Sequence, residues 1–96
     1  MTDQPTDQPA APADVKILVL QRGWVAVGRH TKDGHEHVLT DAAIVRRWGT
    51  SKGLGQIATE GPTGSTVLDR CGTVRAHELA TVLVIDADAG KWANRL

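Results

Sequence analysis

This sequence of 96 residues has no tyrosine and no phenylalanine, so Trp24, Trp48 and Trp92 supply all of its aromatic chemistry apart from histidine. It has a single cysteine, Cys71, which excludes an internal disulfide and is typical of a reducing compartment. Its longest apolar run, residues 79–85, is far shorter than the roughly 20 residues of a membrane-spanning helix. We therefore expect no membrane association.

The sequence also lacks a surplus of charge, because eleven basic and eleven acidic residues cancel. The cancellation is uneven along the chain: residues 1–14 carry −3, residues 15–52 carry +4 and residues 53–96 carry −1. A bound anion is therefore expected on the middle third of the chain.

The N-terminal residues 1–13 have three prolines, a repeated TDQP and no aliphatic residue larger than Met1. This composition predicts a disordered tail, and it lacks the basic start and apolar stretch of a secretion signal. We expect residues 14–96 to form a single β-rich domain, of a size at which self-association is a common source of additional stability.

The first half of this domain is rich in β-branched residues punctuated by turn signals. We predict strands over residues 15–21, 24–31 and 35–39, with a tight hairpin turn at Asp33-Gly34 and a second turn at Thr40-Asp41. Residues 44–48 alternate apolar and basic side chains and favour a further strand, with a short helix capped by Thr40 or Asp41 as the alternative.

In the second half, residues 49–55 are predicted to form a glycine-rich loop and residues 53–60 a helix of about two turns that stops at Gly61-Pro62. Strands are expected at residues 66–68, 72–75 and 79–86. The near-continuous apolarity of the last strand predicts either a central strand buried on both faces or a strand with one face in an oligomer interface. Asp86 or Asp88 is expected to cap a short C-terminal helix.

The expected fold is therefore mainly β within the α+β class. It is a small antiparallel sheet or partly open barrel, with one short central helix and a short C-terminal helix.

The basic centre is the candidate ligand site. Strand alternation predicts that Arg46 and Trp48 share one face and that Arg47 lies on the other. Arginine beside tryptophan suits a phosphate together with a base, and the glycine-rich loop is expected to offer backbone N–H groups at a helix N-terminus. An equally simple interpretation is a core tryptophan, solvated arginines and glycines that only serve turns. The candidate ligand-binding residues are Arg22, Arg29, Arg46, Arg47, Trp48, Ser51, Lys52 and Gly53.

Three histidines lie on the predicted hairpin. A two-residue turn at Asp33-Gly34 places Lys32 opposite His35 and His30 opposite His37. Two imidazoles are too few for a zinc site, and a third ligand would have to come from a distant part of the chain. We expect no metal and no cofactor.

Catalytic patterns are missing as well: no serine elbow, no Cys–His pair at a family spacing and no paired carboxylates in a pocket motif are visible. We therefore expect a protein that is not an enzyme.

The middle of the chain resembles a family of small tailed-phage proteins of unknown function. The matching segments span residues 20–61 and include Arg22 to Gly28, Val38 to Ala42, Arg46-Arg47-Trp48 and Leu54 to Gly61. They are similar to the family pattern R-x-x-A-G-V-x-x-G, A-R-R-x-W and S-L-x-x-L-A-x-x-G. The resemblance implies a phage accessory protein that acts in the bacterial host cytoplasm.

Small β-rich phage proteins with arginine and aromatic pockets are similar to the homo-oligomeric sponges that sequester nucleotide signals of host immunity. We therefore expect a homo-oligomer that binds a nucleotide-like anion without catalysis. One alternative is a protein-interaction module that inhibits or redirects a host protein through an apolar patch around Trp24 or Trp92. Nucleic-acid binding is a third interpretation, which the sequence pI of about 6.9 disfavours.

Overall fold

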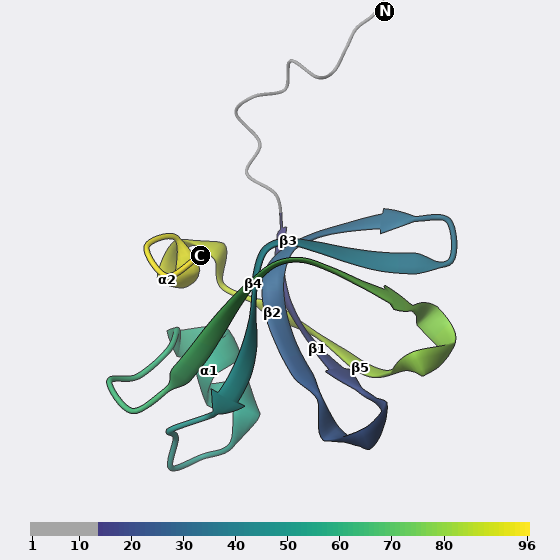
Figure 1. The fold of residues 1–96 in the computed structure, drawn as a ribbon. Coiled ribbons are helices and arrows are strands. Elements are labelled where there is room, and N and C mark those ends of the chain that lie inside the picture. Colours follow the sequence, from purple (N-terminus) through teal and green to yellow (C-terminus); the bar gives the residue numbers. More distant parts are fainter. Residues whose placement is uncertain (1–13) are drawn as a thin grey trace, which may run out of the picture.

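The protein is described by a computed structural model that places residues 14–96; the predicted tail over residues 1–13 lies outside the described residues. Five antiparallel strands form one open sheet in the order β4-β3-β2-β1-β5 (Figure 1). The mainly β fold expected from the sequence is confirmed. The strands are β1 (Asp14–Leu20), β2 (Val25–Asp33), β3 (Glu36–Arg47), β4 (Val67–His77) and β5 (Thr81–Ala87).

Strand β3 is longer than predicted, because the expected turn at Thr40-Asp41 is a bulge within one continuous strand. Asp41 has a φ of 49°, and the pairing register with β2 shifts at this point. A bulge inserts an extra residue and bends the strand without ending it. The same residue types occur in turns and in bulges, so the sequence does not distinguish the two. Residues 44–47 are extended, as preferred over the short helix.

The hairpin between β2 and β3 turns one residue later than predicted. Asp33 pairs with Glu36, so Gly34 and His35 form the two-residue turn, with Gly34 at a φ of 60°. Lys32 consequently lies opposite His37, and His30 lies opposite Leu39. The predicted register is wrong, because glycine takes the first central position of this turn and not the second.

Strands β4 and β5 follow one another in the chain yet occupy opposite edges of the sheet. Only the 3-10 turn η3 (Glu78–Ala80) connects them, so the sheet has to curl strongly to bring these ends together (Figure 1). The prediction that residues 79–86 form a central strand buried on both faces is wrong. An apolar strand sequence is found in buried central strands and also in edge strands with an exposed apolar face. Apolarity by itself therefore does not distinguish the two.

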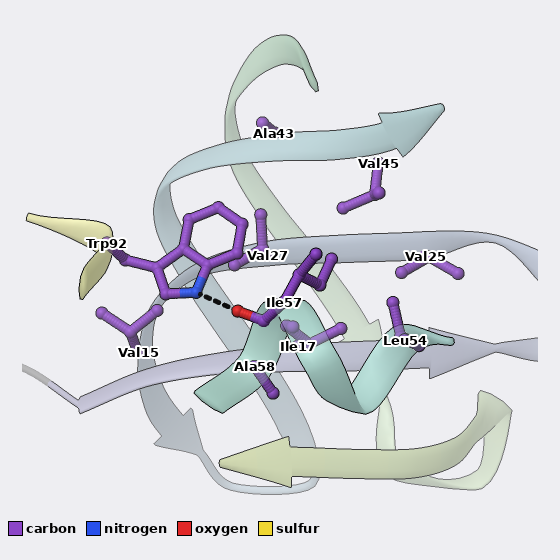
Figure 2. Packing of buried hydrophobic residues seen from close by; sticks show 10 residues of the cluster. All are labelled: Val15, Ile17, Val25, Val27, Ala43, Val45, Leu54, Ile57, Ala58 and Trp92. Carbon is purple, nitrogen blue, oxygen red and sulfur yellow. Dashed lines mark hydrogen bonds between the residues drawn. The ribbon is translucent and has the colours of Figure 1, made fainter. Parts of the chain in front are cut away.

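One face of the sheet carries the larger core. Helices α1 (Leu54–Glu60) and α2 (Ala89–Trp92) cover it, and Figure 2 shows the Trp92 indole lying over Ile57. Trp92 is fully buried, and its Nε1–H donates to the carbonyl oxygen of Ile57 (2.9 Å). The opposite face buries a second, smaller cluster: Leu18, Ala26, Leu39 and Ala42.

Both helices match the predictions from local sequence. Helix α1 ends at Gly61, whose φ of 84° suits glycine and whose N–H donates back to Ile57. Helix α2 is capped by Asp88, which accepts from the N–H groups of Gly90 and Lys91. Of the two caps considered, Asp88 is therefore the one used. Within residues 14–96 no helix has the length and apolarity to cross a membrane.

Candidate functional site

The eight candidate residues occupy three places on the fold. Arg29 lies on β2 opposite Thr40, which is six positions before Arg46 on β3. At about 3.3 Å per residue these two arginines are roughly 20 Å apart along the strand. Arg22 lies in the turn η2 (Gln21–Gly23), next to the end of β2 that pairs with the last part of β3. Arg29 is therefore not part of the same site.

Two of the four candidate arginines form ion pairs with carboxylates of the protein. The guanidinium of Arg46 makes two hydrogen bonds to Asp69 on β4, at 2.8 and 3.3 Å, and this hydrogen bonding raises the pKa of Arg46. Arg29 donates to the carboxylate of Asp41 at 3.2 Å. Neither carboxylate could be assigned from the sequence, since nothing in the chain indicates which residues of β2 and β3, or of β3 and β4, are paired.

A bulge interrupts the regular strand alternation on which the predicted faces of Arg46 and Arg47 depend. Val45 pairs with Leu68 and Arg47 with Val67, so Arg46 has no partner of its own in the ladder. Simple alternation does not hold across a bulge. The placement of the two arginines on opposite faces of the sheet therefore stays a prediction.

The loop after β3 is anchored to residues 63–66 by hydrogen bonds. The hydroxyl of Thr66, a buried residue, donates to the carbonyl oxygen of Trp48, and that of Thr63 donates to Gly49, each at 2.7 Å. Gly49 has a φ of 68°, and a Cβ there would lie 2.4 Å from the backbone of Ser65. Only glycine permits this close approach, so Trp48 leaves the sheet along a defined path.

Two of the backbone donors expected to hold an anion, those of Lys52 and Gly53, are satisfied within the loop. The N–H of Lys52 donates to the side-chain oxygen of Gln56 (3.0 Å), and the N–H of Gly53 donates to Thr50 Oγ1 (3.1 Å). Helix α1 has only seven residues, so its dipole is small. The prediction of a backbone anion site at Ser51 to Gly53 is therefore not supported by the hydrogen bonding.

The side chains that follow β3 remain available. Trp48 is 43% exposed, and Arg47, Ser51 and Lys52 are exposed too. Among residues 14–96, no carboxylate forms an ion pair with Arg47 or Lys52. We call this group of side chains the β3–α1 corner: Arg47, Trp48, Ser51 and Lys52.

The hairpin histidines interact despite the changed register. His30 Nε2 and His37 Nδ1 lie 2.9 Å apart as a diagonal pair on one face. Burial lowers the pKa of both rings, and neighbouring positive charge lowers it further. His35 contacts Glu78 at 3.0 Å and stacks near His77. Within residues 14–96 no three side chains are arranged to hold a metal ion.

A shallow hollow of about 220 Å³ lies elsewhere, at the junction of β1 and β5. Its lining includes Lys16 and Asp86, which pair at 2.6 Å, and none of the eight candidate residues. This hollow is therefore separate from the β3–α1 corner.

No protein-family model matches this chain, and no curated protein is similar to it.

Proposed function

We propose that this protein is a non-catalytic binding module whose β3–α1 corner takes a small ligand that carries both a flat ring and an anion. The observation that carries the proposal is the exposure of Trp48, which follows Arg47 directly in the chain and precedes Lys52 by four residues, while neither cation has a carboxylate partner within residues 14–96. This combination selects a nucleotide-like molecule, because the ring offers a stacking platform and the cations bind phosphate.

The anchored loop supports the proposal on energetic grounds. Hydrogen bonds from Thr63 and Thr66 hold the backbone at Trp48 and Gly49, so little backbone entropy is lost when a ligand binds. Arg47 can make a bidentate contact to a phosphate, whereas Lys52 acts as a compact point charge. Arg29 and Arg46 take no part, because Asp41 and Asp69 neutralise them.

The biological setting follows from the resemblance to tailed-phage proteins. A phage accessory protein in the host cytoplasm that binds a nucleotide-like anion without converting it would serve to sequester a host immune signalling nucleotide. The proposed role is therefore anti-defence binding, with a homo-oligomer as the active form.

Calorimetric titration of the full chain with cyclic di- and trinucleotides and ADP-ribose derivatives tests this proposal. We expect at least one of these ligands to bind, and Arg47→Gln to weaken its affinity about 10- to 100-fold, as a lost charge-assisted contact should. Trp48→Ala should weaken it by a similar factor through lost stacking.

The matched control is Arg75→Gln. Arg75 is another exposed arginine, at the hairpin end of the sheet, where it pairs with Asp33 and Glu36. Its replacement should leave the affinity unchanged. Absence of binding across the whole ligand panel, or equal losses in Arg47→Gln and Arg75→Gln, would refute the proposal.

A protein-interaction module is the second candidate, and the 58% exposure of Trp24 favours it. Trp92 cannot contribute to such a patch, because its side chain is fully buried. Co-purification of one defined host protein with the wild-type chain, lost in Trp24→Ala and retained in Trp48→Ala, would identify this function. Binding to DNA that weakens steeply with salt would instead point to nucleic acid.

A further inference from the structure

The exposed large apolar side chains of this protein are concentrated near one end of the sheet. Among residues 14–96 six such side chains are exposed, and five of them belong to β5 and the two turns beside it. Monomeric proteins expose single apolar residues routinely, whereas a contiguous group marks an interaction surface. We call this group the β5 apolar edge: Trp24, Leu79, Val82, Leu83 and Val84.

Pairing and hydrogen bonds show that these residues are neighbours. Leu20 lies opposite Thr81 at the start of β5, and its N–H donates to the carbonyl oxygen of Trp24 (2.7 Å). The side chain of Gln21 reaches the carbonyl oxygen of Leu79 at 3.4 Å. The turns η2 and η3 therefore lie together beside the first residues of β5.

The backbone of β5 is itself open. Within residues 14–96 this strand pairs only with β1, so no strand occupies its other side; α1 meets it at its end, where the N–H of Asp88 donates to the carbonyl oxygen of Ala58. Such an edge is a template for another strand unless charge, proline or a bulge protects it. The strand bears one charged residue, Asp86, which is paired with Lys16, and one bulge, at Val82.

The opposite edge of the same sheet carries more of these protecting features than β5, which makes β5 the more open of the two edges. Strand β4 carries Asp69, Arg70 and Arg75 over its exposed stretch, and Gly72, with a φ of 77°, interrupts its pairing with β3. Charge and irregularity of this kind prevent edge-to-edge association. Residues 79–85 have neither a charge nor a proline.

We propose that a second copy of this chain covers the β5 apolar edge, with the two β5 strands antiparallel about a two-fold axis. Such pairing joins two five-stranded sheets into one of ten strands. A two-fold interface brings the same patch of both subunits together, so the patch must complement itself. The uncharged stretch over residues 79–85 meets this requirement, and the chain as a whole has no net charge to oppose association.

The available area is consistent with a reversible dimer. Leu79, Val82, Leu83 and Val84 are 80, 61, 54 and 40% exposed, and Trp24 is 58% exposed. At about 60–120 Å² for an aliphatic side chain and up to about 250 Å² for a tryptophan, this is roughly 300–400 Å² of apolar surface per copy.

Interfaces are about 60% apolar, so the whole contact would cover about 500–700 Å² per copy. Stable interfaces cover about 600–1,000 Å² per partner. The expected contact lies at the lower end of this range, so the dimer should dissociate on dilution.

Sedimentation velocity of the full chain over a range of concentrations tests the proposal. The apparent mass should rise from the monomer value of 10.2 kDa towards twice that value as the concentration increases. Leu83→Lys should shift the midpoint of this transition to at least 10-fold higher concentration, because it places like charges at the interface. Thr73→Lys, an exposed position on the protected edge β4, is the matched control and should not shift it.

Hydrogen exchange locates the interface independently of any variant. The amides of residues 82–86 that face away from β1 should exchange more slowly at high concentration than at low concentration, while β4 amides should not change. A chain that stays monomeric at millimolar concentration would overturn the proposal. So would a dimer that Leu83→Lys leaves intact or that protects β4 in place of β5.

Discussion

Trp92 should be the most costly side chain to remove from this protein. It lies in a helix of only four residues, is fully buried, and is the largest of the fully buried side chains. Its ring packs in the core cluster that contains Val15, Ile17 and Ile57, and its indole N–H bonds to Ile57 (Figure 2). Trp92→Ala therefore removes the contact that holds the C-terminal segment and α1 against the sheet.

The magnitude follows from burial and size. Replacing a buried tryptophan by alanine costs about 3–5 kcal/mol. A domain of about 80 residues is stable by roughly 4–12 kcal/mol in total, so the variant should lose a quarter or more of its stability. At about 4–8 °C per kcal/mol, its melting temperature should fall by at least about 12 °C.

Trp92→Phe separates the hydrogen bond from the packing. It keeps an aromatic ring but loses the indole donor, while the Ile57 carbonyl still accepts from the N–H of Gly61 at 3.0 Å. The carbonyl is therefore not left unsatisfied, and the expected cost is only about 1–2 kcal/mol.

Urea unfolding followed by far-ultraviolet circular dichroism measures these free energies, because this signal does not depend on the tryptophan removed. Trp24→Ala is the control: its ring is 58% exposed, so its loss should cost less than about 1 kcal/mol. The reasoning is wrong if Trp92→Ala costs no more than Trp24→Ala.

Three further predictions concern the rest of the fold. Gly28→Ala should cost about 1–3 kcal/mol in urea unfolding, because the new Cβ would lie 2.9 Å from the Cβ of Leu39; a neutral result would contradict the packing described here. Asp88→Ala should cost about 1 kcal/mol through loss of the α2 cap, whereas Asp88→Asn should retain most of the stability; equal losses would argue against capping. Hydrogen bonds from Lys32 and His35 lower the pKa of Glu78 to about 2, so its stabilising effect is complete above pH 4.5 and is lost as the pH falls towards 2. The stability advantage of the wild type over Glu78→Gln should therefore shrink between pH 5 and pH 2.5, and an unchanged difference would refute the ion pair.

Local signals in the sequence determined most of the secondary structure. Branched apolar residues indicated the strands, Gly61-Pro62 marked the end of α1, and Asp88 was one of two expected caps for α2. These features depend on residues within a few positions of one another, so they can be inferred without knowledge of the fold. The contact between His30 and His37 was also predicted, although it arises from a different register.

The candidate site was only partly predictable, because it depends on contacts between residues that are far apart in the chain. Composition indicated a basic centre with a tryptophan, yet the neutralisation of Arg46 depends on Asp69, which lies 23 residues away in the chain. The anchoring of Trp48 likewise depends on Thr66, which only a folded loop brings close. The bulges in β3 determine which residues of the neighbouring strands are paired, and no residue type in the sequence identifies the position of a bulge.

Residue types and their order were enough to predict a β-rich chain with a basic middle and an apolar segment near its C-terminus. The fold then placed this apolar segment on an edge strand and paired four of the seven basic side chains in residues 15–52 with carboxylates. These outcomes could not be predicted, because hydrophobicity and charge are properties of residues, whereas burial and neutralisation are properties of neighbours. Strand order and register determine which residues are neighbours, and both depend on contacts between distant parts of the chain.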